Sequence, residues 1–153
     1  MSDKPVFDEL LVKIDRLVSI GLTRDETLLK VCRLLKSGIA YYDWVGFYLV
    51  EGKKELVLGP FEGEPTEHAR IAFGSGICGQ AAQSKETFLI QDVSSETNYL
   101  SCSPKVKAEI VIPIFRGEKI AGELDIDSHQ LSPFTDQDRD FLEEVCRRLS
   151  GVF

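Results

Sequence analysis

The stretch EIVIPIFRGEKIAGELDID, residues 109–127, decides the fold that we expect. It holds two apolar, β-branched runs, 109–115 and 119–127, which are separated only by Arg116-Gly117-Glu118. Runs of this composition around a short turn that contains glycine are typical of a β-hairpin. The stretch therefore predicts an antiparallel pair of strands, and the elements around it extend that prediction.

Three helices are predicted around the strands, two before them and one after. Apolar residues recur at helical spacing over 7–18 and over 28–35. Thr23 and Glu26 form a capping-box pattern at the start of the second helix. The third helix is expected to begin near Thr135. Each helix can therefore pack one apolar face against a sheet.

Shorter elements are expected between these helices. In chain order they are strands over 44–50 and 55–58, a strand that ends near residue 72, a short helix over 80–84 and a strand over 87–90. Gly59-Pro60 is expected to end the second of these strands. The order predicts an α+β fold, an antiparallel sheet of five or six strands flanked by helices from both termini, with a short inserted helix.

The composition indicates one globular domain over residues 1–153. The chain has 18 basic and 25 acidic residues, so its formal net charge is −7. This balance argues against nucleic acid as a partner, because phosphate binding needs clustered Lys and Arg. No apolar run is long enough to span a membrane, and Met1–Pro5 lacks the pattern of a secretory signal. We therefore expect a cytoplasmic protein.

Four cysteines, at positions 32, 78, 102 and 146, are too few and too scattered for a disulfide-stapled secreted domain. The absence of a C-x-x-C pair gives weak support for a zinc site, and we expect no bound metal. Cys32 and Cys146 lie on the apolar stripes of predicted helices, and we interpret both as packing residues.

Cys78 and Cys102 lie outside such stripes. Cys78 stands between glycines at the start of a short helix, where unpaired backbone N–H groups lower a thiol pKa, but it could equally fill a crowded turn. Cys102 lies in a polar loop, where a thiol is either a nucleophile or a surface residue without a role. Position alone does not decide the role of either cysteine.

Acidic residues alternate with apolar ones along 121–127, so the acids share one face of the predicted strand. They are Glu123, Asp125 and Asp127. A charged face is usually solvated, and we expect this of Glu123. Aspartate is depleted in strands, however, so the presence of Asp125 and Asp127 in this strand needs an explanation.

A compensating cation is one such reason, because close carboxylates repel each other and the pKa of one of them rises. The ammonium group of a ligand would supply this cation. Glu109 starts the neighbouring strand and could face the same spot, together with Trp44 or Tyr48. The residues thus predict a pocket for a small cationic or zwitterionic molecule beside a thiol.

The sequence resembles the GAF-domain family over nearly its whole length, through the glycine turn 74–79, the closing hairpin and the helix after Pro133-Phe134-Thr135. A more specific set of motifs is similar to the free methionine-(R)-sulfoxide reductases, stand-alone GAF enzymes that reduce the free amino-acid sulfoxide. These motifs are DWVGFY (43–48), LVLGPFEG (56–63), GICG (76–79), EIVIP (109–113), LDIDS (124–128) and the spacing from Cys78 to Cys102.

The resemblance implies a role for each candidate residue. Cys102 matches the catalytic cysteine, which attacks the sulfoxide sulfur and becomes a sulfenic acid, and Cys78 then forms a disulfide with it. A thioredoxin-type reductant acts as co-substrate, and no bound cofactor or metal is implied. The matches to the substrate-binding positions are Glu109, Asp125 and Asp127 around the amino group, and Trp44 and Tyr48 around the methyl end.

The sequence departs from the family pattern at two places. Many members carry a third cysteine that pairs with the catalytic one, and His68 occupies that position here. Asn98-Tyr99-Leu100-Ser101 replaces a stretch that usually contains Gly-His.

Two other functions stay open on the sequence alone. One is a GAF module that senses a small molecule, and the other is a thiol redox sensor without turnover. The acid cluster favours the reductase, because it suits a substrate with an amino group. The amphipathic first and last helices could also form a homodimer interface.

Overall fold

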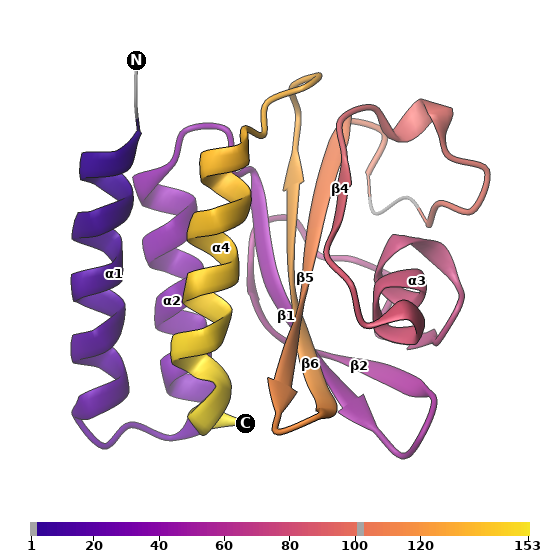
Figure 1. Cartoon of the computed structure of the whole chain (residues 1–153). Coiled ribbons are helices and arrows are strands. Elements are labelled where there is room, and N and C mark those ends of the chain that lie inside the picture. Colours follow the sequence, from indigo (N-terminus) through magenta and orange to yellow (C-terminus); the bar gives the residue numbers. More distant parts are fainter. Residues whose placement is uncertain (1–2, 101–102) are drawn as a thin grey trace.

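The computed structural model describes residues 3–100 and 103–153, and within them a six-stranded sheet forms the centre of the protein (Figure 1). The strands are β1 (Trp44–Glu51), β2 (Glu55–Glu62), β3 (Arg70–Ala72), β4 (Phe88–Ile90), β5 (Ala108–Arg116) and β6 (Lys119–Ser128). They lie in the order β3-β2-β1-β6-β5-β4. All neighbouring strands are antiparallel, which confirms the predicted fold class.

The helices cover the two faces of this sheet unequally. Figure 1 shows α1 (Lys4–Ser19), α2 (Arg24–Gly38) and α4 (Asp136–Leu149) on one side, and α3 (Gly76–Ser84) on the other. Two short 3-10 helices, η1 (Val93–Ser95) and η2 (Ser150–Val152), follow β4 and α4. The helices from both termini and the inserted helix are thus present as predicted.

Helices α2 and α4 begin at capping boxes. The Thr23 hydroxyl accepts a hydrogen bond from the Glu26 N–H at 3.2 Å, and the Glu26 carboxylate accepts one from the Thr23 N–H at 3.0 Å. Thr135 and Asp138 form the same reciprocal pair before α4. These bonds satisfy N–H groups that the first turn of a helix leaves unpaired, and the first of them confirms the capping box predicted for α2.

Strand β2 is longer than predicted. Gly59 and Pro60 were expected to end it, but they lie within it, and it continues to Glu62. The pairing of β1 with β2 shifts register between Gly46 and Tyr48, so β2 carries an extra residue at this point. A bulge interrupts the hydrogen-bond ladder, and β2 therefore tolerates the missing N–H of Pro60.

Helix α3 begins earlier than predicted, at Gly76 instead of Gln80. The glycines that suggested a turn lie at the start of the helix. A Cβ at Gly79 would come within 2.5 Å of the Ala72 carbonyl oxygen, so glycine lets α3 pack closely against the end of β3. Cys78 is consequently a buried residue of the first helical turn.

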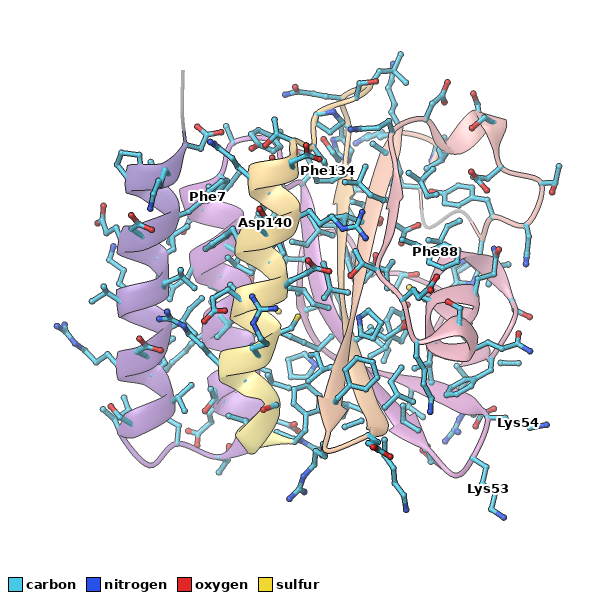
Figure 2. The ribbon with its side chains drawn as sticks, viewed as in Figure 1. Phe7, Lys53, Lys54, Phe88, Phe134 and Asp140 are labelled. Atoms are coloured by element: carbon cyan, nitrogen blue, oxygen red, sulfur yellow. The ribbon has the colours of Figure 1, made fainter. Side chains whose placement is uncertain are left out.

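The two faces of the sheet carry separate clusters of buried side chains. The cluster under α1, α2 and α4 is the main apolar core and includes Leu124 and Ile126 of β6. Figure 2 shows side chains filling the space between these helices and the sheet, whereas Lys53 and Lys54 at the β1–β2 turn point into solvent. The smaller cluster under α3 includes Trp44, Tyr48, Leu56, Ile71, Ile77, Cys78 and Val111.

Candidate functional site

The acids of β6 share the face of the sheet that α3 covers. The strict alternation along β6 is confirmed, because the intervening leucine and isoleucine belong to the core on the opposite face. Glu123 was expected to be solvated, and this was wrong: it is 0% exposed, and Asp125 and Asp127 are each 1% exposed. Helix α3 and its flanking loops exclude water from this face, so the carboxyl groups are buried together.

Cross-strand pairing brings the other predicted residues to the same face. Trp44 lies directly opposite Asp127 and Tyr48 lies opposite Glu123 on the neighbouring strand β1. Glu109 of β5 lies opposite Asp127 from the other side and is also buried. Directly opposed residues in an antiparallel pair point to the same side of the sheet, so these side chains surround one spot.

Cys78 contacts this group of acids from α3. Its thiol lies 3.9 Å from Glu109 Oε2, in a geometry that lets the thiol donate a hydrogen bond. One ligand atom from each of Cys78, Glu109 and Asp125 lies within 4.8 Å of the other two. Three elements that are distant in the sequence therefore meet at this point.

The structure corrects the expectation for the Cys78 thiol. Its pKa is raised well above the ordinary value, first by burial and then by the carboxylates of Asp125 and Glu109. The helix N-terminus does favour a thiolate, but loss of water and nearby negative charge outweigh that effect. Cys78 is thus a protonated thiol at neutral pH until a cation or a base changes its surroundings.

Burial also raises the pKa of the neighbouring acids. The pKa of Asp125 is raised by burial, an effect that hydrogen bonds from Glu109 and Cys78 oppose. The pKa of Glu123 is raised well above its ordinary value by burial and by the charge of Asp125. Within the described part of the chain, neither oxygen of Glu123 has a hydrogen-bond partner. Such a site favours a ligand that brings positive charge.

An aromatic wall stands beside the acids. The Trp44 indole N–H donates to the Glu64 carbonyl at 2.9 Å, and its ring stacks on Phe61 with centroids 5.5 Å apart. A Cβ at Gly46 or at Gly63 would come within 2.6 Å of the indole, so both glycines make room for it. The Trp44 ring is therefore held firmly next to the strand position that faces Asp125.

Tyr48 and the loop after η1 close the site from two other directions. The Tyr48 hydroxyl donates to the His68 carbonyl at 2.9 Å. The Asn98 side chain accepts from the Gly76 N–H at 2.9 Å and donates to the Gly74 carbonyl at 2.8 Å, which ties the loop to the start of α3. This anchoring by Asn98 could not be read from the sequence, because an asparagine in a polar loop carries no signal of its own.

These elements enclose a small cavity. Its lining is made by Tyr48, His68, Ile71, Ser75, Gly76, Ile77, Cys78, Leu100, Glu109 and Asp125. The cavity has room for about 10 Å³, about the space of one water molecule. The cavity is therefore too small for a free amino acid unless its lining moves outward.

The structure brings together six of the seven predicted site residues: Cys78, Trp44, Tyr48, Glu109, Asp125 and Asp127. Cys102 lies outside the described residues. The chain on either side of it lines the site, since Leu100 lines the cavity with Cys78, and Ser103 lines an adjoining pocket with Trp44 and Asp127.

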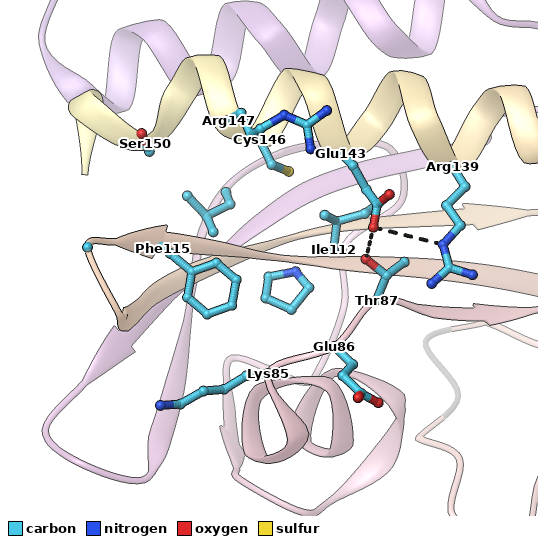
Figure 3. A pocket seen from close by; sticks show the side chains of 13 residues that line it. Lys85, Glu86, Thr87, Ile112, Phe115, Arg139, Glu143, Cys146, Arg147 and Ser150 are labelled. Carbon is cyan, nitrogen blue, oxygen red and sulfur yellow. Dashed lines mark hydrogen bonds and ion pairs between the residues drawn. The ribbon is translucent and has the colours of Figure 1, made fainter.

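A larger groove of about 680 Å³ lies between α4, β5 and the end of α3 (Figure 3). Its charged groups pair with each other, because Glu143 accepts a hydrogen bond from Thr87 at 2.7 Å and forms an ion pair with Arg139 at 3.8 Å. The Cys146 thiol beside it is buried, which raises its pKa. Among the described residues, the groove has no cluster of buried acids like that of the cavity, and we place the candidate site in the cavity.

Comparison with known proteins identifies the family of this chain. A family model described as GAF domain matches residues 21–152. GAF domain-containing protein A of Dictyostelium discoideum is 36% identical over 150 residues, which cover 98% of this chain and 94% of that protein. Free methionine-R-sulfoxide reductase of Escherichia coli is 36% identical over 126 residues, covering 82% of this chain and 75% of that protein.

A solved structure extends the comparison to the whole chain. Free methionine-R-sulfoxide reductase from Neisseria meningitidis, solved in complex with its substrate, superposes with a TM-score of 0.93 at 35% identity and covers 100% of this chain and 92% of its own. The chain therefore belongs to the GAF-domain family. Within that family it is closely related to the free methionine-R-sulfoxide reductases. No helix in the described part of the chain is long and apolar enough to cross a membrane.

Proposed function

We propose that this protein reduces free L-methionine (R)-sulfoxide to methionine, with Cys102 as the nucleophile. The observation that carries the proposal is the buried group formed by Glu109, Asp125 and Asp127, with Cys78 and Trp44 at its border. The similarity to proteins named free methionine-R-sulfoxide reductase supports the same proposal.

Substrate binding follows from the charge of the site. An amino acid brings an ammonium group, which compensates the carboxylates and lowers the cost of keeping them ionised. The Trp44 ring, held by its hydrogen bond to Glu64 and by Phe61, offers an apolar surface to the methyl end. The pocket thus suits a free amino acid, whereas the same residue within a peptide has no ammonium group to offer.

The chemical step oxidises a cysteine while it reduces the sulfoxide. The Cys102 thiolate attacks the sulfoxide sulfur, the oxygen takes up one proton and passes to the Cys102 sulfur, methionine leaves with its sulfur reduced, and Cys102 remains as a sulfenic acid. Glu109, Asp125 and Asp127 are the candidate proton donors, and burial raises the pKa of Asp125 so that it holds a proton more readily.

Cys78 resolves the sulfenic acid in the next step. Its thiol gives up a proton to Glu109, whose Oε2 lies 3.9 Å from the sulfur, and attacks Cys102 to form a disulfide and release water. A thioredoxin-type dithiol then reduces the disulfide and becomes oxidised itself. Over the cycle, one sulfoxide and one external dithiol become methionine, an external disulfide and water.

Thioredoxin-coupled oxidation of NADPH tests this function. Free L-methionine (R)-sulfoxide should support turnover, while the (S) epimer and a peptide-bound sulfoxide should not. Cys102→Ser should abolish turnover, and Cys32→Ser, at a buried position of α2, provides the control. Absence of turnover with an active thioredoxin system would overturn the proposal.

A sensing GAF module is the second candidate, and the raised pKa of Cys78 favours it, because a protonated thiol is a weak nucleophile. Binding of the sulfoxide without turnover, measured by calorimetry, would identify that function. Formation of a Cys78–Cys102 disulfide on oxidation without turnover would identify a redox sensor instead.

A further inference from the structure

We propose that Cys78, Glu109 and Asp125 form a binding site for a thiophilic divalent cation such as Zn²⁺. The three residues come from α3, β5 and β6, and all are buried. Their ligand atoms lie within 4.8 Å of one another, and the Cys78 sulfur lies 3.9 Å from Glu109 Oε2. The sequence carries no zinc pattern because these ligands are distant from each other along the chain.

The spacing of the ligand atoms is close to what zinc needs. With Zn–S at about 2.3 Å and Zn–O at about 2.0–2.2 Å, tetrahedral ligand atoms lie roughly 3.5 Å apart. Side-chain movements of less than about one ångström would therefore close the site around the ion. Three protein ligands leave a fourth position for water, which is the arrangement of an open zinc site.

A second observation points to a ligand at this place. Asp125 is 1% exposed, and although Glu109 and Cys78 hydrogen-bond to its carboxyl group, its Oδ1 atom has no hydrogen-bond partner among residues 3–100 and 103–153. Asp125 lines the cavity together with Cys78 and Glu109. Buried carboxylate oxygens without a partner are uncommon in native proteins and call for an explanation such as a bound ion. The cavity itself has room for about one water molecule.

The donor set selects the type of metal. A thiolate ligand favours Zn²⁺, Cd²⁺ or Co²⁺, while Mg²⁺ and Ca²⁺ take oxygen ligands and are expected to bind weakly. A bound cation would also displace the thiol proton of Cys78 and compensate the carboxylates around it. The metal would therefore remove the charge repulsion that the closed pocket contains.

The metal site overlaps the place where the proposed substrate would put its ammonium group. A bound Zn²⁺ would consequently exclude the substrate and hold Cys78 away from Cys102. This inhibitory consequence rests on the proposed function, but binding of the metal does not.

Titration of the reduced full-length protein with Co²⁺ tests the site directly. One equivalent should produce a thiolate-to-cobalt charge-transfer band in the near ultraviolet, and Zn²⁺ should remove the band by displacement. Cys78→Ser should abolish the band, and Asp125→Asn should weaken binding at least about tenfold. Cys146→Ser and Cys102→Ser should keep both the band and the affinity.

Circular dichroism of each variant shows whether it is folded, and a folded Cys78→Ser variant that keeps the band would overturn the site. No band in the wild-type protein would also overturn it, and so would loss of the band in Cys102→Ser. Binding without reductase activity would support the metal site and contradict only the proposed function. If excess Zn²⁺ inhibits turnover without raising KM, the metal and the substrate ammonium group do not share one site.

Discussion

The two faces of strand β6 are equally buried, but one carries apolar side chains and the other carries acidic ones. Leu124 and Ile126 are both 0% exposed within the apolar core under α1, α2 and α4. Asp125 and Asp127, their neighbours on the same strand, are each 1% exposed under α3. Burial of apolar groups stabilises a fold, while burial of carboxyl groups costs free energy. The buried acids thus work against stability, which fits the ligand site proposed above.

The largest loss of stability is expected from a substitution on the face of β6 that packs against α1, α2 and α4. Leu124→Ala should lower the free energy of unfolding by about 2–5 kcal/mol, because it leaves a cavity in a closely packed core. Urea denaturation measures the loss, and KM for the sulfoxide should not change in the protein that remains folded. A raised KM in Leu124→Ala would show that the two faces are not independent.

The matched change on the other face is Asp125→Asn. It should raise KM at least about 30-fold, or roughly 2 kcal/mol, because a buried ammonium loses its charged partner. The free energy of unfolding should stay the same or increase, since a buried acid is removed. Steady-state kinetics and urea denaturation of the same sample check both parts. An unchanged KM would contradict the assignment of the pocket.

A pH effect is expected from Glu123. Its pKa is raised in the folded protein, so between the ordinary value of about 4.5 and the folded value the native state binds more protons than the unfolded state. Stability should therefore fall as pH rises through this range, by up to about 1.4 kcal/mol per pH unit for each such proton. In Glu123→Gln this slope should be smaller.

The measurement is the free energy of unfolding between about pH 5 and pH 8. Glu118→Gln, at an exposed position of the β5–β6 turn, is the control and should leave the slope unchanged. Identical slopes for wild type and Glu123→Gln would show that Glu123 does not titrate with the predicted shift.

The smallest effect is expected at Cys32. This thiol is 0% exposed in the apolar core and donates to the Pro60 carbonyl at 3.5 Å. Cys32→Ala should lower the free energy of unfolding by roughly 1 kcal/mol, because it removes one buried atom and one weak hydrogen bond. Thioredoxin-coupled turnover of the folded protein should not change. A loss of turnover would show that α2 contributes to catalysis.

Local signals explain how much of the fold could be predicted. The capping box of Thr23 and Glu26 and the hairpin over 109–127 each depend on residues that are close in the sequence, and the structure confirms both. Pro60 misled the prediction because a bulge, which depends on the register with β1, accommodates it. The alternation along β6 correctly placed its acids on one face.

The errors at the site have a common physical cause. Burial of Glu123 and the raised pKa of Cys78 both arise where α3 packs over acids from β5 and β6. The chain contributes these groups from well-separated positions, and a charged strand face looks the same in sequence whether or not a helix covers it. The predicted roles of Cys78 and Cys102 stay predictions, and the latter lies outside the described residues.

The position of Trp44 has a practical consequence. The chain contains one tryptophan, and it is the residue that stacks on Phe61 at the border of the acid cluster. Its fluorescence therefore reports on this one location without interference from another indole. An incoming zwitterion or ion that changes the field around Asp127 should alter that emission, so occupancy can be followed in the unlabelled protein.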